Sequence, residues 1–257
     1  MKEFLKNNHF LLITINKMHY KIHYFKFLIS TQDKAEEFAE KGLSNTVILA
    51  GNQIKGRGRF NRKWHSDKGG LFMSILLRPK NVRNLQYLTF IAAISVRNSI
   101  KKTTNLQTNI KWPNDLHYKG RKLCGIITEG KFGKNNFVSV GIGLNVNQAK
   151  FRNEIRDTAI SLRMIKHRVF DIKKLAGSIC KEFFFLYKQY YSENKLEKIR
   201  NIWEKYCDTI NKRVTVISQS RKIYGKAVGI DTECNLLIKL KNNRIIKIIE
   251  GDINVRY

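Results

Sequence analysis

The chain has 257 residues, and 42% of them are hydrophobic, which is enough to bury a core and excludes an intrinsically disordered protein. Its 49 Lys and Arg residues against 20 Asp and Glu residues give a formal net charge of +29. No apolar run approaches the roughly 18 residues of a membrane span, so we expect a cytoplasmic protein with no membrane partner.

The strong positive charge leaves two interpretations open. A dedicated surface for nucleic acid would produce it. A drift of the composition toward Lys, Asn and Ile would also produce it, and the spread of basic residues along the whole chain favours this interpretation. The four cysteines are far apart in the sequence, which predicts separate reduced thiols rather than a zinc site.

The first half of the chain alternates between strand-like and helix-like patterns. Residues 1–19 show little pattern and predict only an N-terminal extension. In chain order, the patterns then predict a strand over Lys21–Leu28, a helix that begins near Ser30, strands over Thr46–Ala50 and Leu71–Leu77, a helix over Leu85–Ile100, and strands over Asn109–Trp112, Leu123–Thr128 and Phe137–Val146. Gly42 is suited to end the first helix, and Pro113 ends the fourth strand with a turn at Asn114–Asp115.

In the second half of the chain, the pattern changes near Cys207 from helix-like to strand-like. Before this residue, the sequence predicts two amphipathic helices, Ile172–Tyr191 and Leu196–Tyr206. After it, short strand-like runs separated by turns predict a small β-barrel of about fifty residues: Arg213–Ile217, Ile223–Ile230, Leu236–Leu240 and Arg244–Ile249.

The stretch from Gln53 to Gly70 is a basic loop, broken by glycines, between two predicted buried strands. It carries six cations and one acid: Lys55, Arg57, Arg59, Arg62, Lys63, Lys68 and Asp67. Guanidinium groups and exposed backbone N–H groups bind phosphate and carboxylate oxygens, so the loop predicts a site for an anionic small molecule. A solvated basic loop in a very basic protein is the alternative.

Three stretches lie in a fixed order along the chain: GRGRFNRKWHSDKGGLFMSILLRP (Gly56–Pro79), KWPNDLHYKGRKLCGIITE (Lys111–Glu129) and VGIGLNVN (Val140–Asn147). With these gaps they resemble the biotin–protein ligase family, the biotin–[acetyl-CoA-carboxylase] ligases. The last segment, GDINVR (Gly251–Arg256), is similar to the end of that family's C-terminal β domain. The resemblance extends over about Tyr24–Arg256, as in a short form without an N-terminal DNA-binding domain.

The resemblance implies an α+β fold, with a mixed β-sheet flanked by helices (the class II synthetase-like, biotin–lipoate ligase fold) and a small C-terminal SH3-like β-barrel. It implies an extension at 1–19, a catalytic domain for biotin and ATP at 20–208, and a β domain at 209–257. The implied reaction is ATP-dependent ligation of biotin to a specific lysine of a biotin carboxyl carrier domain through biotinyl-5′-AMP. Pyrophosphate and then AMP are released, and Mg²⁺ is expected, because two anions must be brought together.

The resemblance also implies roles for individual residues. Catalytic roles fall on Arg57, Lys122 and Lys111. Biotin contacts fall on Ser30, Thr31, Gln53, Gly56, Arg57, Arg59, Gly125 and Gly143. Contacts to ATP or the adenylate fall on Arg59, Arg62, Trp64, Asn114, Asp115, Asn145, Asp252 and Arg256, with Asp115 as the candidate magnesium ligand. A structural turn is the alternative for Asn114 and Asp115, and solvated charge is the alternative for Asp252 and Arg256.

Two positions depart from the family pattern. Gln32 lies where asparagine is usual, and Lys55 lies where a small residue is usual. The amide of Gln32 can still donate and accept hydrogen bonds, although its arm is longer.

Partners and rival functions follow from the same resemblance. A lipoyl or octanoyl ligase of the same fold is a second enzyme hypothesis, and a nucleic-acid binder is the non-enzyme hypothesis. About twenty residues precede the catalytic region, too few for a winged helix, so we expect no specific DNA site. Homodimers are common in the family, and the sequence leaves the oligomeric state open.

Overall fold

The computed structural model describes residues 9–15, 18–79, 82–133, 135–218 and 221–256. In chain order its elements are β1 (His9–Ile15), β2 (Met18–Phe25), α1 (Thr31–Glu40), β3 (Thr46–Ala50), the 3₁₀ turn η2 (Arg59–Asn61), β4 (Leu71–Leu77), α2 (Gln86–Thr104), β5 (Asn109–Lys111), β6 (Asp115–Tyr118), β7 (Arg121–Lys131), β8 (Phe137–Leu144), α3 (Leu162–Lys166), α4 (Ile172–Leu186), the π-helical turn η3 (Tyr187–Tyr191), α5 (Leu196–Tyr206), β9 (Arg213–Ser218), β10 (Arg221–Ile230), β11 (Leu236–Lys239), β12 (Ile245–Ile248) and β13 (Asp252–Arg256).

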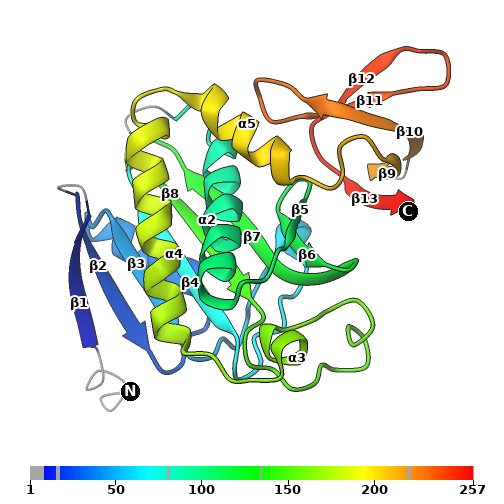
Figure 1. Cartoon of the computed structure of the whole chain (residues 1–257). Coiled ribbons are helices and arrows are strands. Elements are labelled where there is room, and N and C mark those ends of the chain that lie inside the picture. The colour runs from blue at the N-terminus through cyan, green and yellow to red at the C-terminus, as the bar shows by residue number, and fades with distance from the viewer. Residues whose placement is uncertain (1–8, 16–17, 80–81, 134, 219–220, 257) are drawn as a thin grey trace.

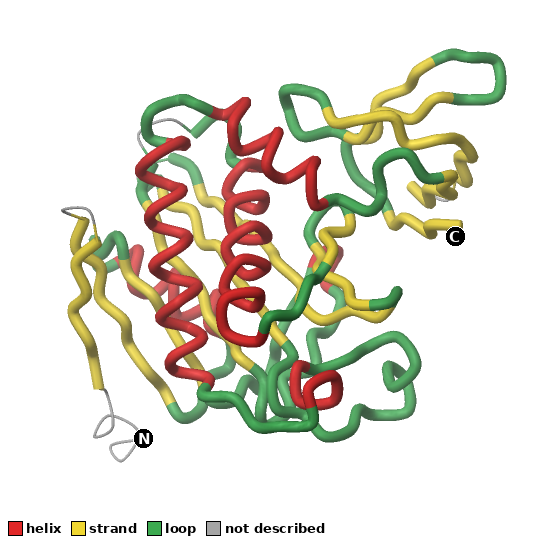
Figure 2. Tube along the Cα trace, viewed as in Figure 1, coloured by secondary structure: helices red, strands yellow, loops and turns green. Residues whose placement is uncertain are grey.

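The larger sheet has eight strands in the order β1-β2-β3-β4-β8-β7-β6-β5. Its strands β2 and β3 are parallel, because α1 carries the chain back between them, and the other described neighbours are antiparallel. Helices α2 and α4 cover one face of this sheet, and α1 lies on the other face (Figure 1; Figure 2 shows the same layers by element type). The mixed sheet flanked by helices that the resemblance implied is confirmed.

The central strands are apolar along their whole length because both of their faces are covered. Every residue of β3 and of β4 is buried. On the side of α1, Ala35 and Ala39 pack against Ile48 and Leu76. The predicted strands Thr46–Ala50 and Leu71–Leu77 are therefore confirmed with the same bounds. The loop at 51–70 connects these two buried strands.

Helix α1 begins where the sequence predicts. The side chain of Ser30, in extended backbone conformation, accepts a hydrogen bond from the backbone N–H of Gln32 at 3.1 Å and so caps the helix. Gly42 follows the helix with a φ of +78°, which favours glycine. Ser30 is thus held at the N-terminus of α1, and the residue is 2% exposed.

Several elements differ from the sequence-based expectation. Residues 9–15, inside the segment expected to be only an extension, form β1, and its backbone pairs with β2. The helix predicted to reach Tyr191 continues past Leu186 as a π-helical turn. Strand β6 and the short helix α3 were not predicted. The turn predicted at Asn114–Asp115 lies one residue earlier than expected, so Asp115 already belongs to β6.

The smaller sheet is a five-stranded antiparallel unit in the order β12-β11-β10-β9-β13, as expected for the SH3-like domain. It contacts the larger domain through the KWPND segment and through helix α2. The indole Nε1 of Trp112 donates to the backbone oxygen of Cys234 at 3.0 Å, and its backbone N–H donates to Thr209 Oγ1 at 3.1 Å. The hydroxyl of Tyr87 donates to the backbone oxygen of Thr232 at 3.0 Å. These bonds hold the smaller sheet beside the strands that carry the predicted site.

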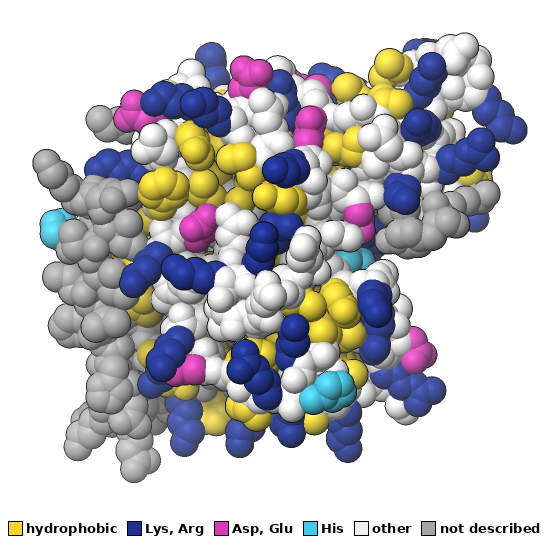
Figure 3. All heavy atoms as spheres, viewed as in Figure 1, with side chains coloured by type: hydrophobic (Ala, Val, Ile, Leu, Met, Phe, Trp, Pro, Cys, Tyr) yellow, Lys and Arg dark blue, Asp and Glu magenta, His cyan; other side chains and the backbone are white. Residues whose placement is uncertain are grey.

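The four cysteines are buried and unpaired, as predicted. Lys and Arg side chains are spread over the face shown in Figure 3. Within the described ranges, the structure has no helix that is both long and apolar enough to span a membrane.

Candidate active site

A cavity of about 190 Å³ lies between the loop after β3 and the strands β4, β7 and β8. Most of the residues that the sequence predicted for the site line this one cavity: Ser30, Thr31, Gln53, Arg57, Arg59, Arg62, Trp64, Asn114, Asp115, Lys122, Gly125, Gly143 and Asp252. They come from distant segments of the chain, from Ser30 to Asp252. The fold therefore assembles the three motifs and the last strand around one space.

One end of the cavity carries fixed, uncharged hydrogen-bonding groups. Gln53 Oε1 accepts from the backbone N–H of Thr31 at 2.7 Å and from its hydroxyl at 3.0 Å. The hydroxyl of Ser74 donates to Thr31 Oγ1 at 2.8 Å, and Gln53 Nε2 donates to Ser66 Oγ at 2.9 Å. Apolar side chains line the adjoining wall: Met73, Ile126, Ile127 and Ile142. This end suits a small uncharged polar ring attached to an apolar chain.

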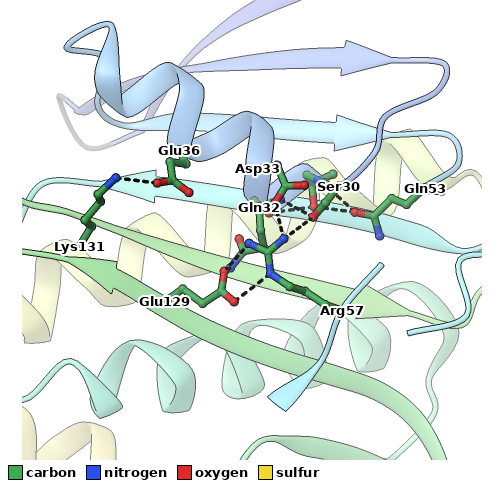
Figure 4. A network of polar contacts seen from close by, with 10 residues as sticks. Ser30, Gln32, Asp33, Glu36, Gln53, Arg57, Glu129 and Lys131 are labelled. Atoms are coloured by element: carbon green, nitrogen blue, oxygen red, sulfur yellow. Dashed lines mark hydrogen bonds and ion pairs between the residues drawn. The ribbon is translucent and has the colours of Figure 1, made fainter. Parts of the chain in front are cut away.

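Arg57 enters the cavity from the basic loop and meets two acids (Figure 4). Its Nε and NH2 donate to Glu129 Oε1 and Oε2, each at 3.0 Å, and its NH1 contacts Asp33 Oδ1 and, at 3.4 Å, Ser30 Oγ. Hydrogen bonding to Glu129, only partly offset by burial, raises the pKa of Arg57 above its ordinary value, and Asp33 adds to this effect. The guanidinium is therefore a fixed positive charge at any physiological pH.

Lys122 brings a second positive charge into the cavity from β7. Its Nζ lies 2.8 Å from Asp115 Oδ2, and His117 Nε2 lies 3.8 Å from the same oxygen. Burial raises the pKa of Asp115, but Lys122 and His117 outweigh burial and hold this pKa at about 2. The carboxylate is ionised, and its other oxygen, Oδ1, is buried and has no hydrogen-bond partner in the described part of the chain.

Trp64 lies over two glycines of the central strands. A Cβ at Gly143 would be 2.5 Å from Trp64 Cε2, and a Cβ at Gly125 would be 2.8 Å from Trp64 Cζ3, so any larger residue would displace the indole. Lys122 Nζ lies 5.5 Å from the centroid of the same ring, within cation–π range. These two glycines, predicted as points of close approach to biotin, are in this structure the surface on which Trp64 rests.

A second cavity of about 180 Å³ adjoins the first. It is lined by Lys63, Trp64, His65, Lys122, Asn145, Ile155, Thr158 and Ala159. Lys63, Trp64 and Lys122 border both cavities. Asn145 lies here rather than in the main cavity, and its Nδ2 donates to the backbone oxygen of Lys122 at 3.4 Å. The space is therefore suited to a ligand that continues from the first cavity past the indole.

The tip of the basic loop contacts the smaller domain. Arg62 donates through both terminal nitrogens to the carboxylate of Asp252. Phe60 has a φ of +56°. The guanidinium carbon of Arg59, Cζ, lies 4.7 Å from the centroid of the Phe60 ring. Arg59 NH1 donates to Asn114 Oδ1 at 3.4 Å, and burial lowers the pKa of Arg59. Two guanidinium groups thus lie over the mouth of the cavity beside the first strand residue of the C-terminal segment.

Four predicted residues do not line the main cavity. Lys111 lies opposite Asp115 in the pairing of β5 with β6, and burial lowers its pKa. Gly56 supports the loop, since a Cβ there would be 2.4 Å from Ser66 Oγ. Asn145 borders the second cavity, as described above. Arg256 belongs to β13, and its side chain lies outside the described part of the structure.

Sequence reasoning missed the two acids that bind Arg57. Glu129 is the last residue of the KWPND…ITE stretch and received no role, and Asp33 was considered only as part of a helix start. The signal that could have found them is the charge of the loop itself, since six cations with one local acid need counter-charges from elsewhere. Gln32, which departs from the family pattern, donates to Glu129 Oε2 at 2.9 Å.

Comparison with known proteins agrees with this geometry. The chain matches the model of the Biotin/lipoate A/B protein ligase family over residues 24–147 and that of the Biotin protein ligase C terminal domain over residues 209–256. It is 36% identical over 239 residues to the Bifunctional ligase/repressor BirA of Bacillus subtilis, covering 90% of this chain and 73% of that protein. It is 27% identical over 218 residues to the Biotin--[acetyl-CoA-carboxylase] ligase of Mycobacterium tuberculosis, covering 82% and 79%.

The structural similarity extends over both domains. The biotin protein ligase from Aquifex aeolicus, solved in complex with biotin and ATP, superposes with a TM-score of 0.81 at 31% identity, covering 91% of this chain and 98% of that one. The motifs, the two domains and the assembled cavity therefore have the same explanation: this chain belongs to the biotin protein ligase family.

Proposed function

We propose that the cavity around Arg57 and Lys122 is where this chain performs the reaction of its family, the ATP-dependent ligation of biotin to a carboxylase protein. The observation that carries this proposal is the convergence of two fixed cations, from separate motifs, next to an uncharged polar end. The Aquifex aeolicus relative, solved with biotin and ATP, supports the assignment of both substrates.

Biotin has a ureido ring, an apolar tail and a carboxylate. We assign the ring to the polar end formed by Ser30, Thr31 and Gln53, because preformed donors and acceptors there match a neutral cyclic urea. The isoleucine wall suits the tail. We assign the carboxylate to Arg57 and Lys122, two of the cations that line the same cavity.

The first chemical step joins the biotin carboxylate to the α-phosphate of ATP and forms biotinyl-5′-AMP with release of pyrophosphate. Both reacting groups are anions, so fixed positive charge at the point of contact lowers the barrier. Arg57 supplies a planar fork for carboxylate or phosphate oxygens, and Lys122 supplies a compact charge that can follow oxygens as the geometry changes. Arg59 and Arg62, at the mouth, suit the phosphates that leave.

The second cavity suits the nucleoside. Trp64 offers a ring on which the adenine can stack, and the amide of Asn145 can donate to and accept from the hydrogen-bonding edge of the adenine. Mg²⁺ fits as a companion of the nucleotide, because it is usually held by one or two carboxylates together with phosphate oxygens, and Asp115 has a carboxylate oxygen without a partner. Bound there, the ion would neutralise phosphate charge. Among the described residues no cluster of three or more metal-binding side chains exists. Phosphate oxygens and water would complete the coordination of the ion.

The residue roles are tested with Arg57→Ala and Lys122→Ala, and Lys68→Ala serves as the control. Lys68 is an exposed cation of the same loop region and lines neither cavity. Removing one group that stabilises transition-state charge lowers kcat by about a hundredfold or more. We expect this loss in pyrophosphate release with biotin and ATP for the two cavity variants, measured at a temperature where circular dichroism shows each variant to be folded, and no loss for the control. Normal turnover in either cavity variant would remove that residue from the mechanism.

The same pyrophosphate-release assay with lipoate separates the two enzyme hypotheses. Biotin-dependent pyrophosphate release that lipoate neither replaces nor inhibits excludes a lipoyl ligase. Transfer of the biotinyl group from the adenylate to a lysine of a biotin carboxyl carrier domain completes the proposed reaction.

Four further points about this protein stay predictions. The chain is expected to bind no specific DNA sequence, and any DNA binding that persists at about 200 mM salt with a sequence preference would contradict this. The oligomeric state and the role of Lys111 are also open to measurement, by sedimentation and by Lys111→Ala. A cytoplasmic location remains a prediction from the sequence.

A further inference from the structure

Arg57 is held by two acids through different edges of its guanidinium (Figure 4). Glu129 takes the edge formed by Nε and NH2, with two parallel bonds of 3.0 Å. Asp33 contacts NH1 only. A guanidinium has two edges that can bind a carboxylate through a pair of bonds, so Glu129 fills one edge completely and Asp33 fills the other only in part.

Glu129 is itself fixed from two sides. Its backbone pairs with Ser139 in the ladder between β7 and β8. Its Oε2 accepts from Gln32 Nε2 at 2.9 Å. Gln32 is 4% exposed, and a Cβ at Gly141 would be 3.0 Å from its Cδ, so the amide that braces Glu129 is packed against the sheet.

Asp33 lacks such support. It lies in the first turn of α1, its side chain is 47% exposed, and it contacts Arg57 through one oxygen only. An incoming carboxylate or phosphate carries the same sign of charge and binds the same NH1 and NH2 edge. When such a ligand replaces Asp33, the guanidinium of Arg57 still pairs with one anion at this edge, both before and after the ligand binds.

We infer that the two acids have opposite roles: Glu129 is a positioning residue that fixes the plane of Arg57, and Asp33 is a placeholder that the reacting anion displaces. This inference rests on the proposed function of Arg57. It also gives a reason for Gln32, whose longer arm reaches Glu129, so that this departure from the family pattern braces the positioning residue.

The experiment compares Asp33→Asn and Glu129→Gln, with Glu36→Gln as a matched control. Glu36 lies on the same helix as Asp33 and pairs with Lys131 of the same strand as Glu129, at 2.9 Å (Figure 4). It does not touch Arg57, so its removal changes the net charge equally without altering the guanidinium. Biotin affinity is measured by calorimetry, and kcat and KM by pyrophosphate release at saturating ATP.

Asp33→Asn is expected to bind biotin about two- to fivefold more tightly, because a partly exposed ion pair of modest strength no longer competes for Arg57. Glu129→Gln is expected to lower kcat by about ten- to a hundredfold, because a misoriented Arg57 no longer meets the reacting oxygens. Glu36→Gln is expected to change neither quantity by more than about twofold. The opposite signs for two acids on one arginine are a result that general destabilisation does not produce.

Gln32→Met provides the second test of positioning. Methionine has nearly the volume of glutamine and leaves the charge of Glu129 unchanged, but it removes the hydrogen bond from Gln32 to Glu129. We expect kcat to fall by about three- to tenfold, with KM for biotin and the melting temperature unchanged. Equal effects of Asp33→Asn and Glu129→Gln, or an unchanged kcat in Glu129→Gln, would overturn the inference while wild-type turnover keeps the proposed function intact. Absence of biotin-dependent pyrophosphate release in the wild type would overturn the proposed function and this inference together.

Discussion

The ion pair between Lys122 and Asp115 makes the sharpest prediction about stability. Lys122→Met removes the ammonium and retains an apolar stem of similar length, so packing against Gly125 and Trp64 is preserved. Asp115 then keeps a side chain that is only 20% exposed, without its main cation. Burial of that carboxylate is then opposed by the weaker effects of His117, Lys111 and Arg59, so its pKa rises above the wild-type value.

The magnitude follows from the pKa of Asp115. Its pKa falls from the ordinary value of 3.8 to about 2 in the folded protein, which corresponds to about 2 kcal/mol of stability at neutral pH. Lys122 is 37% exposed and therefore partly screened by solvent, so we expect about 1 to 2 kcal/mol for its share. Because the folded-state pKa is lowered, this stability is complete above the ordinary pKa of 3.8 and is lost as the pH falls through about 2.

A double-mutant cycle measures this coupling by urea unfolding. The four proteins are the wild type, Lys122→Met, Asp115→Asn and the double variant, and the expected coupling energy at about pH 7 is about 1 to 2 kcal/mol. Lys131→Met is the control, since its pair with Glu36 has nearly the same length, 2.9 Å, but is exposed on both sides. The control should lose much less stability than Lys122→Met, because solvent screens an exposed pair.

The pH dependence of this stability difference can refute the assignment of the coupling to Lys122 and Asp115. The difference between wild type and Lys122→Met should be full near neutral pH and should shrink as the pH is lowered below about 4, because both proteins then approach a protonated Asp115. A coupling energy below about 0.5 kcal/mol, or a difference that does not change with pH, would show that solvent already screens this pair.

Two further substitutions test the packing and the domain contact. Gly143→Ala puts a methyl group 2.5 Å from Trp64, and we expect ATP binding, measured by calorimetry, to weaken by about tenfold. The control is Gly177→Ala, at an open position of α4, which should stabilise the protein by about 0.5 kcal/mol or more. Asp252→Asn removes the pair with Arg62, and because both side chains are exposed by more than a third, unfolding should change by less than about 1 kcal/mol while trypsin cleavage after Arg62 accelerates. Unchanged ATP binding in the first case, or unchanged cleavage in the second, would contradict the observed contacts.

The sequence by itself determined the local elements of the site and the family. Apolar runs at Thr46–Ala50 and Leu71–Leu77 are strands because every side chain in them is buried, and Ser30 caps a helix because its hydroxyl reaches a backbone N–H two residues on. The motifs that contain Arg57 and Lys122 were recognisable since each is continuous in the chain. Such features depend on neighbours within one turn or one strand.

Only the tertiary structure decided which charges meet. Arg57 and Glu129 are 72 residues apart, and their two bonds exist because the loop after β3 folds back across β7. The register of β5 with β6 places Lys111 opposite Asp115, which lines the main cavity, whereas Lys111 itself is not among the residues that line it. The physical reason is that pairing across a sheet depends on strand order and register, which no local pattern specifies.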